Sequence, residues 1–184
     1  MARLIVVRHG ETDYNHEGRY QGSIDVDLNE NGRRQARLVV KELQSRSIDC
    51  IISSPLKRAR ATAEIIAASL HLEVELMGEF AERSLGSFEG KTKKELFDGD
   101  PHLVDRHITR QIYAAPPRGE SLFDFGFRVN RGLDILKQRG ADQNILLVCH
   151  GGVVRTLHGL FRRIPDHELF DYRLENCEMD EYEW

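Results

Sequence analysis

Three apolar, strand-like segments of the chain are each followed by side chains suited to binding or attacking phosphate. The segments are residues 4–7, 50–52 and 145–149, and the side chains that follow them are Arg8, His9, Arg58 and His150. The carboxyl ends of parallel strands in an α/β sheet line one crevice, so residues far apart in sequence can meet around one anion. Two histidines and two arginines at one crevice would suit phosphoryl transfer, which needs a nucleophile surrounded by positive charge.

The elements that must position these side chains alternate between strand and helix. Asn29 is placed to cap a helix that runs to about residue 47, and Pro55 marks the start of a second helix. Alternating apolar residues then predict a short strand over 72–76. The residues expected to face inward from the two helices are Ala36, Val39, Val40, Leu43, Ala59, Ala63, Ile66, Ala67 and Leu70.

The second half of the chain repeats this alternation. Ser121 and Asp124 form a capping arrangement before a third helix. The residues that this helix would bury are Leu122, Phe125, Val129, Leu133 and Leu136. A last helix is expected from Gly151 to about residue 160, and a final edge strand over 175–184. The pattern predicts an α/β fold, a three-layer α/β/α sandwich with a mostly parallel central sheet and a small insertion over the active site.

Five short motifs occur along the chain in a fixed order. They are Arg8-His9-Gly10-Glu11-Thr12 with Asn15, Ser54-Pro55-Leu56 with Arg58, Thr62 and Ala63, Glu82 with Gly86 and Glu89-Gly90, Gly119-Glu120-Ser121, and Cys149-His150-Gly151-Gly152. In this order the motifs resemble the signature of the histidine phosphatase superfamily. That family includes cofactor-dependent phosphoglycerate mutases, α-ribazole phosphatases and broad-specificity phosphatases. The resemblance implies the family's α/β fold and its phosphoryl-transfer chemistry.

His9 is the candidate nucleophile. A neutral imidazole can attack phosphorus in line and form a phosphohistidine, which divides one difficult displacement into two. The positive charges of Arg8 and Arg58 would disfavour the imidazolium form and keep a nitrogen lone pair available near neutral pH. A histidine at a strand end could otherwise be structural, but its setting between Arg8 and Gly10 favours a catalytic role.

Arg8 and Arg58 can each offer a bidentate fork to the phosphoryl oxygens. His150 would supply a further charged donor as an imidazolium, and the amide of Gly151 at a helix start would add a fixed dipole. A metal-binding role for His150 is disfavoured, because no second histidine or carboxylate lies at a ligand-like spacing. We therefore expect no metal ion and no cofactor.

Glu82 is the candidate general acid. One carboxyl of raised pKa can protonate the leaving alkoxide and then take a proton from the attacking water. On residue type alone, Glu79, Glu89 and Glu120 compete for this role. The family resemblance selects Glu82, which stands at the family's acid position ahead of Gly86.

Further contacts with substrate are expected around the nucleophile loop. Asn15 would donate from its amide, and Thr12 would orient the loop. The resemblance also places Arg19, Gln21 and Gly22 where similar enzymes contact substrate. Residues 91–118 have a poor pattern and are interpreted as an insertion, or lid, over the site.

Composition is that of one ordinary domain over residues 1–184. The net charge of −4 gives no basic field that would attract nucleic acid or a membrane surface, and no apolar stretch approaches 18 residues. The first strand begins near residue 3, which leaves no room for a signal peptide, and the chain ends earlier than is usual in the resembled family. Cys50, Cys149 and Cys177 are expected to be free thiols in a reducing compartment, which favours a cytoplasmic location.

These observations favour a metal-independent phosphatase that hydrolyses a small phosphate monoester. A phosphoglycerate mutase is the first alternative, although the mutases carry a longer insertion that supplies paired arginines. Arg106 and Arg110 could imitate that pair. The second alternative is a non-catalytic protein that binds a phosphorylated ligand. α-Ribazole 5′-phosphate, phosphoglycerate, phosphoserine and sugar phosphates all remain open as substrates, and the sequence is compatible with a homodimer.

Overall fold

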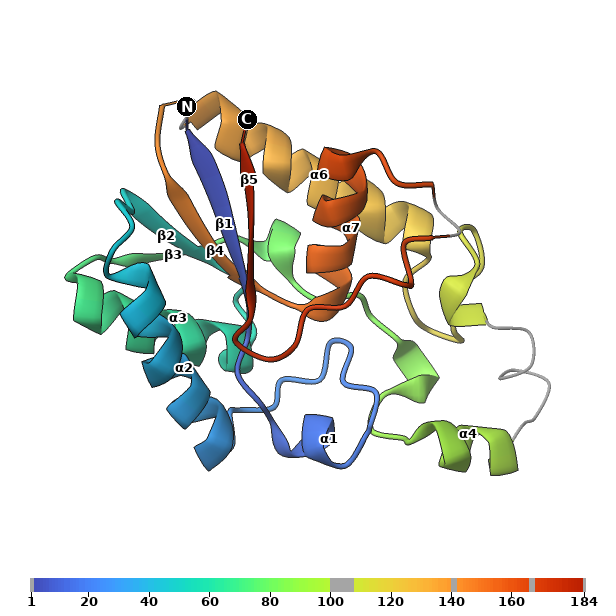
Figure 1. The fold of residues 1–184 in the computed structure, drawn as a ribbon. Helices are drawn as coiled ribbons and strands as arrows, with labels where there is room; N and C mark the ends of the chain where they lie inside the picture. The colour runs from blue at the N-terminus through green and yellow to red at the C-terminus, as the bar shows by residue number, and fades with distance from the viewer. Residues whose placement is uncertain (1, 100–107, 140–141, 166–167, 184) are drawn as a thin grey trace.

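Five strands form one sheet at the centre of the fold (Figure 1). The structure is a computed structural model that describes residues 2–99, 108–139, 142–165 and 168–183. The strands are β1 (Arg3–Arg8), β2 (Cys50–Ser53), β3 (Val74–Leu76), β4 (Ile145–Cys149) and β5 (Met179–Glu183), in the order β3-β2-β4-β1-β5. Strands β1 to β4 are parallel, and only β5 is antiparallel, at the edge beside β1. The predicted mostly parallel sheet is therefore confirmed.

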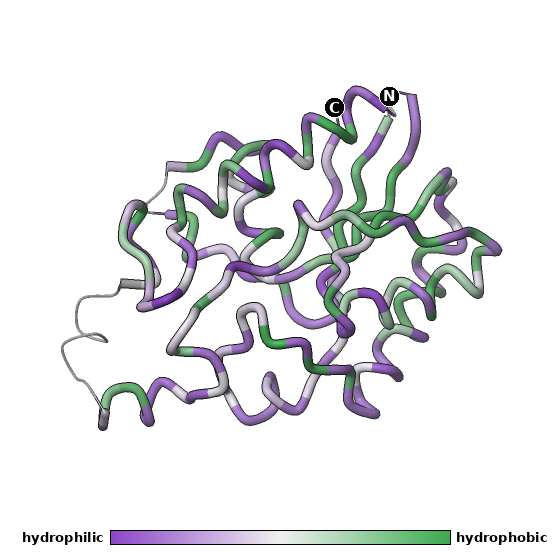
Figure 2. The backbone as a smooth tube through the Cα atoms, turned by 180° about the vertical axis from the view of Figure 1, so that it is seen from behind, coloured by the Kyte–Doolittle hydropathy of each residue, from purple (hydrophilic) through white to green (hydrophobic). Residues whose placement is uncertain are grey.

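Helices cover both faces of this sheet. Helices α2 (Glu30–Leu43) and α3 (Lys57–Leu70) lie on one face, whereas α6 (Leu122–Arg139) and α7 (Gly151–Arg162) lie on the other (Figure 1). Successive strand residues point to opposite faces, so Leu4 and Val6 enter one core while Ile5 and Val7 enter the other. Figure 2 shows hydrophobic residues concentrated in the central strands, whereas β5 carries three acidic residues. The three-layer sandwich is confirmed.

The helix boundaries follow the apolar stripes closely. Asn29 caps α2 by accepting a hydrogen bond from the Gly32 amide, as expected. The helix ends at Leu43 and not near residue 47, because the polar residues after Leu43 have no apolar side chain to bury. Helix α6 is capped by Ser121, whose Oγ accepts from the Asp124 amide at 3.0 Å. Of its expected inner face, only Leu122 is not fully buried.

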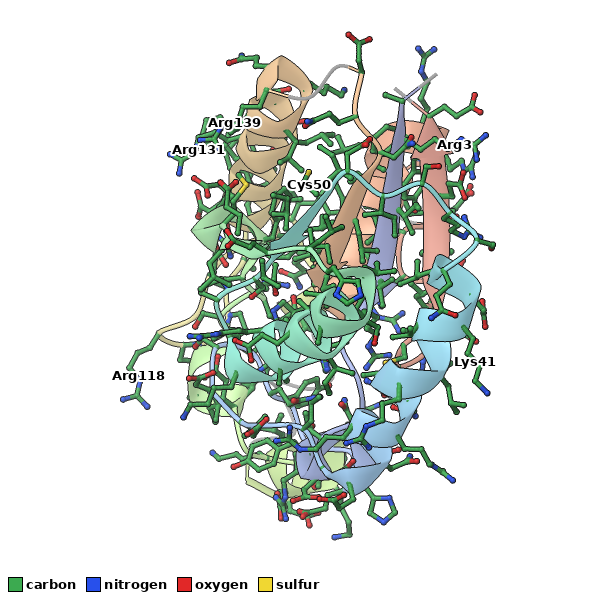
Figure 3. All side chains as sticks on the ribbon, turned by 90° about the vertical axis from the view of Figure 1, so that its left-hand side faces the viewer. Arg3, Lys41, Cys50, Arg118, Arg131 and Arg139 are labelled. Carbon is green, nitrogen blue, oxygen red and sulfur yellow. The ribbon has the colours of Figure 1, made fainter. Side chains whose placement is uncertain are left out.

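Several charged residues of these helices lie on the outside. Figure 3 shows Lys41 of α2 and Arg131 and Arg139 of α6 pointing away from the sheet. None of the described helices is long and apolar enough to cross a membrane.

The two edge strands are shorter than predicted. Strand β3 includes Val74 and Leu76 but not Leu72, and Leu76 remains exposed at the sheet edge. Strand β5 begins at Met179 because the residues before it bond to Arg8, the last residue of β1, whose carbonyl accepts from the Cys177 amide at 2.9 Å. The C-terminal segment is thereby joined to the end of β1.

The predicted insertion over 91–118 contains a short helix and a 3₁₀ turn. Helix α4 spans Lys93–Gly99 and the turn η3 spans Ile108–Arg110. Residues 100–107, including Arg106, lie outside the described residues. The remaining short elements are α1 (Asp13–His16), η1 (Gly78–Phe80) and η2 (Gly86–Phe88).

Candidate active site

The side chains that follow β1, β2 and β4 meet at one edge of the sheet, as predicted. Arg8 at the end of β1 pairs with Cys149 at the end of β4, and Ser53 at the end of β2 pairs with Val148. Because these strands are parallel, the residues that follow them leave the sheet at one edge. His9, Ser54 and His150 therefore lie close together, although up to 141 positions separate them in sequence.

A cavity of about 870 Å³ opens at this edge. A volume of this size is typical of a small-molecule site. The predicted site residues that line it are Arg8, His9, Arg19, Gln21, Gly22, Arg58, Glu82 and Gly151. Asn15, Thr12 and His150 lie outside this set of lining residues.

His9 is held in one tautomer by its own loop. Its Nδ1 lies 2.7 Å from the Gly10 carbonyl, which can only accept, so Nδ1 carries the proton and Nε2 keeps its lone pair. The residue is 3% exposed. Burial, followed by the charges of Arg58 and Arg8, lowers the pKa of His9 well below its usual value. The ring is therefore neutral near pH 7, as predicted, although burial is a larger cause than the arginines.

The peptide between His9 and Gly10 is fixed from both sides. The Asn176 side chain donates to the His9 carbonyl at 2.9 Å, and the Gly10 amide donates to the Thr62 hydroxyl at 3.0 Å. These two bonds hold the orientation of the peptide, so the Gly10 carbonyl stays within hydrogen-bond distance of His9 Nδ1. Sequence reasoning missed the role of Asn176, since it lies 167 positions from His9 and carries no spacing signal.

Arg58 is the largest fully buried side chain in the described structure. It reaches from α3 to the loop after α1, where Nη1 and Nη2 donate to the carbonyls of Ile24 and Gly22 at 2.7 and 2.8 Å. Burial lowers its pKa to about 10, against the opposing effect of Glu82. It stays charged at neutral pH. Its Nε is buried and has no hydrogen-bond partner.

Arg8 has a similar environment on the other side of His9. Its Nη1 donates to the Leu174 carbonyl at 2.8 Å, while its Nε is buried without a partner. A buried N–H of a charged group that lacks an acceptor is costly. Two such groups at one cavity favour an anionic ligand with several oxygens.

His150 lies directly behind His9, with the two ring centroids 5.2 Å apart. Its Nε2 forms a 2.7 Å hydrogen bond with the Ser54 hydroxyl, and its Nδ1 is buried without a partner. Burial and the charge of Arg58 lower the pKa of His150 well below its usual value. The expected imidazolium is therefore wrong for this environment, because full burial beside two guanidinium groups disfavours a third positive charge. Ser54 was in a recognised motif, but its bond to His150 was not foreseen.

Glu82 is the only carboxylate among the described residues that line the cavity. Its two oxygens accept from the amides of Arg83 at 2.9 Å and Gly152 at 3.0 Å. The second contact binds Glu82 to the first turn of α7. A Cβ at Gly152 would lie 2.3 Å from Glu82 Oε1, so this approach requires a glycine.

The competing glutamates are engaged elsewhere. Glu79 pairs with Arg131, and Glu120 forms a two-bond pair with Arg128. Glu89 accepts from the amide of Leu85 at 2.8 Å and from Ser23, and so holds together two loops. The geometry agrees with the preference for Glu82.

The nucleophile loop is stabilised mainly by its own contacts. Thr12 caps α1, and its hydroxyl donates to Gln21 Oε1 at 2.9 Å. Asn15 Oδ1 accepts from Thr12 and from Asn176, so this oxygen belongs to the loop's framework. Arg19 lines the cavity but pairs with Glu17 and Glu95. The roles of these residues toward substrate stay predictions.

The cysteines are unpaired, and none resembles a nucleophile. Cys149 is fully buried at the end of β4, and burial raises the pKa of its thiol. Burial also raises the pKa of Cys177, to about 12. A thiolate is required for attack, so Cys149 is not a candidate nucleophile. No group of three potential metal ligands occurs within the described ranges.

The known proteins that the chain resembles are named phosphatases and phosphoglycerate mutases. The chain is 37% identical to the uncharacterized phosphatase PhoE of Bacillus subtilis over all of its own length and 89% of the relative's. It is 34% identical to a probable phosphoglycerate mutase of Photorhabdus laumondii, again over the whole chain and 86% of the relative. A mycobacterial glucosyl-3-phosphoglycerate phosphatase, solved with VO₃, superposes with a TM-score of 0.89 at 29% identity, covering 98% of this chain and 92% of that one.

The family profile extends over nearly the whole chain. The histidine phosphatase superfamily (branch 1) matches residues 4–184. The matched region contains all five motifs, strand β1 from Leu4 onward and the other four strands described above. The chain belongs to the histidine phosphatase superfamily.

Proposed function

We propose that the protein is a metal-independent phosphatase that hydrolyses a small phosphate monoester through a phosphohistidine at His9. The observation that supports this most strongly is the state of His9, a buried neutral ring whose proton is held on Nδ1 by the Gly10 carbonyl. Its Nε2 is therefore unprotonated near pH 7, and the lone pair is available for attack. Arg8 and Arg58 line the same cavity and supply the charge that a phosphoryl group requires.

The first step would transfer the phosphoryl group to the enzyme. His9 Nε2 attacks phosphorus as the bond between phosphorus and the ester oxygen breaks. Glu82 gives its proton to the leaving oxygen, so that a neutral alcohol departs. Arg8 and Arg58 stabilise the charge on the equatorial oxygens through the Nε groups that have no other partner.

The second step would release inorganic phosphate. Glu82, now a carboxylate, takes a proton from a water molecule that attacks phosphorus. The P–N bond breaks and its electron pair returns to Nε2, which regenerates neutral His9. Neutral His150 has a buried Nδ1 without a partner at this site. In the tautomer that carries its proton on Nδ1, this nitrogen donates to a phosphoryl oxygen while Nε2 accepts from the Ser54 hydroxyl.

The substrate is proposed to be a small soluble ester. Phosphoserine, phosphoglycerate, sugar phosphates and α-ribazole 5′-phosphate are the first compounds to test. The unpaired cysteines support a reducing compartment such as the cytoplasm as the place of action.

The decisive test is phosphate release from a panel of these esters in excess EDTA, with wild-type protein beside His9→Ala. Release by wild type alone supports the mechanism, whereas equal release by His9→Ala would refute it. His16→Ala is the matched control, since His16 is exposed on α1. Phosphohistidine is labile in acid and stable in base, so trapped phosphoprotein should show this pattern in wild type only.

A phosphoglycerate mutase is the second candidate, because Arg110 lines the cavity and could bind a carboxylate. A mutase primed with bisphosphoglycerate would interconvert phosphoglycerates faster than it releases phosphate. Binding of phosphate without turnover of any ester would instead indicate a non-catalytic protein.

A further inference from the structure

The cavity extends well beyond the groups that would bind a phosphoryl group. Its volume of about 870 Å³ is near the upper end for small-molecule sites, and a phosphoryl group fills only a small part of it. The remaining space lies between helices α6 and α7. If the proposed function is correct, this space must receive the alcohol portion of the ester.

Helix α6 contributes an apolar wall. Leu122, Phe123, Gly126 and Phe127 all line the cavity, at the spacing of one helix face. Phe123 is 54% exposed and Phe127 is 68% exposed, although the same helix buries four other apolar residues completely. Two exposed phenylalanines beside one cavity are typical of a ligand-binding surface.

Helix α7 and the segment after it form the opposite wall. Leu160 of α7 is 43% exposed and lines the cavity, together with Leu169 and Phe170. Leu169 packs tightly on α7, since a Cβ at Gly159 would lie 2.3 Å from its Cδ2. This wall is therefore held in place by packing.

Two of the three arginines on this side of the cavity lie against an aromatic ring, and the third, Arg173, pairs with Glu175. The guanidinium carbons of Arg110 and Arg155 lie 5.3 and 5.2 Å from the centroid of Phe170. Stacking on a ring occupies a face of each guanidinium group. The wall opposite α6 therefore combines apolar side chains with the planar faces of stacked guanidinium groups. Such a surface suits a bulky apolar group.

We propose that the preferred substrate is a phosphate monoester of a bulky apolar alcohol, alkyl or aromatic, whose apolar part binds between Phe123 and Phe127 of α6 and Leu160 of α7. This inference rests on the proposed function, because the cavity is continuous from His9 to these side chains. Transfer of the apolar part from water into this space supplies binding free energy that a small polar alcohol lacks.

A series of n-alkyl phosphates from ethyl to octyl tests the proposal. The leaving alcohols have nearly equal basicity, so differences in kcat/KM reflect binding of the chain. Each added methylene should raise kcat/KM about threefold until the space is filled, and hexyl phosphate should exceed ethyl phosphate by at least tenfold. A flat series, with activity lost in His9→Ala, would overturn this inference and leave the proposed function intact.

Two variants and one control locate the effect. Phe127→Gln removes an apolar wall, and Gly126→Leu fills the space from a position where an added Cβ meets no atom within 4 Å. Both should flatten the dependence on chain length. Phe97→Gln, on α4 and outside the cavity lining, also removes an exposed phenylalanine and should keep the wild-type series. Flattening by Phe97→Gln, or none by the other two, would contradict the proposal.

Two further measurements cover the other outcomes. Calorimetry with ethyl- and hexylphosphonate, which cannot be hydrolysed, reports the same preference if no ester is turned over, and equal affinities would overturn the proposal. Butyl phosphate is compared with 3-carboxypropyl phosphate. Faster turnover of the carboxylate would show that Arg110 and Arg155 bind a second anion in this space, which also overturns it.

Discussion

At the level of single residues, the site depends on two imidazoles that the fold keeps neutral. The pKa values of His9 and His150 are lowered well below 6.5, chiefly by burial. In the unfolded chain both residues take up a proton as the pH falls below about 6.5, whereas the folded protein does not. The free energy of unfolding therefore decreases as the pH falls below about 6.5. Above this pH the two histidines do not affect it.

This difference predicts a loss of stability on acidification. Between pH 6.5 and 5.5 the two histidines together should lower the free energy of unfolding by ~2 kcal/mol. Urea unfolding at both pH values measures the change, and His9→Asn or His150→Asn should each remove about half of it. If the pH dependence is the same in wild type and variants, the histidines are not the source.

Asn176 is a positioning residue, since it bonds to the His9 carbonyl and to Asn15 Oδ1. Asn176→Asp keeps the size but replaces the donor with an acceptor that faces two oxygens. We expect kcat to fall about 10- to 100-fold with KM nearly unchanged, because a small displacement of the nucleophile is costly. Steady-state kinetics test this, with Asn31→Asp as control, since Asn31 is a partly exposed residue of α2 outside the cavity lining. A rise in KM alone would indicate a contact with substrate instead.

The motif residues could be predicted, whereas their supports could not. His9, Arg58 and Glu82 were identified because they follow strands or stand in recognised motifs. The contributions of Asn176 and Leu174 come from a C-terminal segment that no periodicity connects with the site. The dominance of burial over the arginines in setting the pKa of His9 also depends on packing, which the sequence pattern does not contain.

At the level of elements, the start of α7 joins the acid to the rest of the site. The Gly152 amide donates to Glu82, and no side chain fits between them. Gly152→Ala should therefore displace the Glu82 carboxyl and lower kcat/KM about 10- to 100-fold. Gly99→Ala on α4, where an added Cβ meets no atom within 4 Å, is the control.

The expected loss concerns chemistry more than folding. An alanine raises helix propensity at a position inside α7, so the free energy of unfolding should change little in Gly152→Ala. Enzyme assays and urea unfolding on the same preparations separate the two effects. A fully active Gly152→Ala protein would show that Glu82 tolerates displacement, and would weaken its assignment as the acid.

Elements with strong periodicity were predicted more accurately than edge elements. Helices α2, α3, α6 and α7 occur where apolar stripes placed them, because burial of one face determines where a helix lies. The start of β5 was wrong by four residues, since Cys177 and Glu178 bond to Arg8, the last residue of β1, without continuing the strand pairing. Such a contact depends on the tertiary structure.

On the scale of the whole molecule, the two cores hold the strand ends in a fixed arrangement and concentrate positive charge at one edge. Arg8 and Arg58 are both buried there, each with an Nε that has no partner. An anion that accepts from these groups binds the folded state and not the unfolded chain. Phosphate should therefore stabilise the entire domain by mass action.

At a phosphate concentration 100 times its dissociation constant, the free energy of unfolding should rise by ~2.7 kcal/mol. For a domain of this size, the melting temperature should increase by about 5–10 °C. Calorimetry at a constant ionic strength measures this effect. Arg58→Lys retains the charge but loses the guanidinium fork that bonds Gly22 and Ile24, so phosphate should raise its melting temperature less. Arg60→Lys is the control, because Arg60 is exposed and phosphate should raise the melting temperature of this variant as much as that of wild type. Equal responses in all three proteins would mean that phosphate binds elsewhere. The site at the ends of β1, β2 and β4 would then not be the one that binds the phosphoryl group.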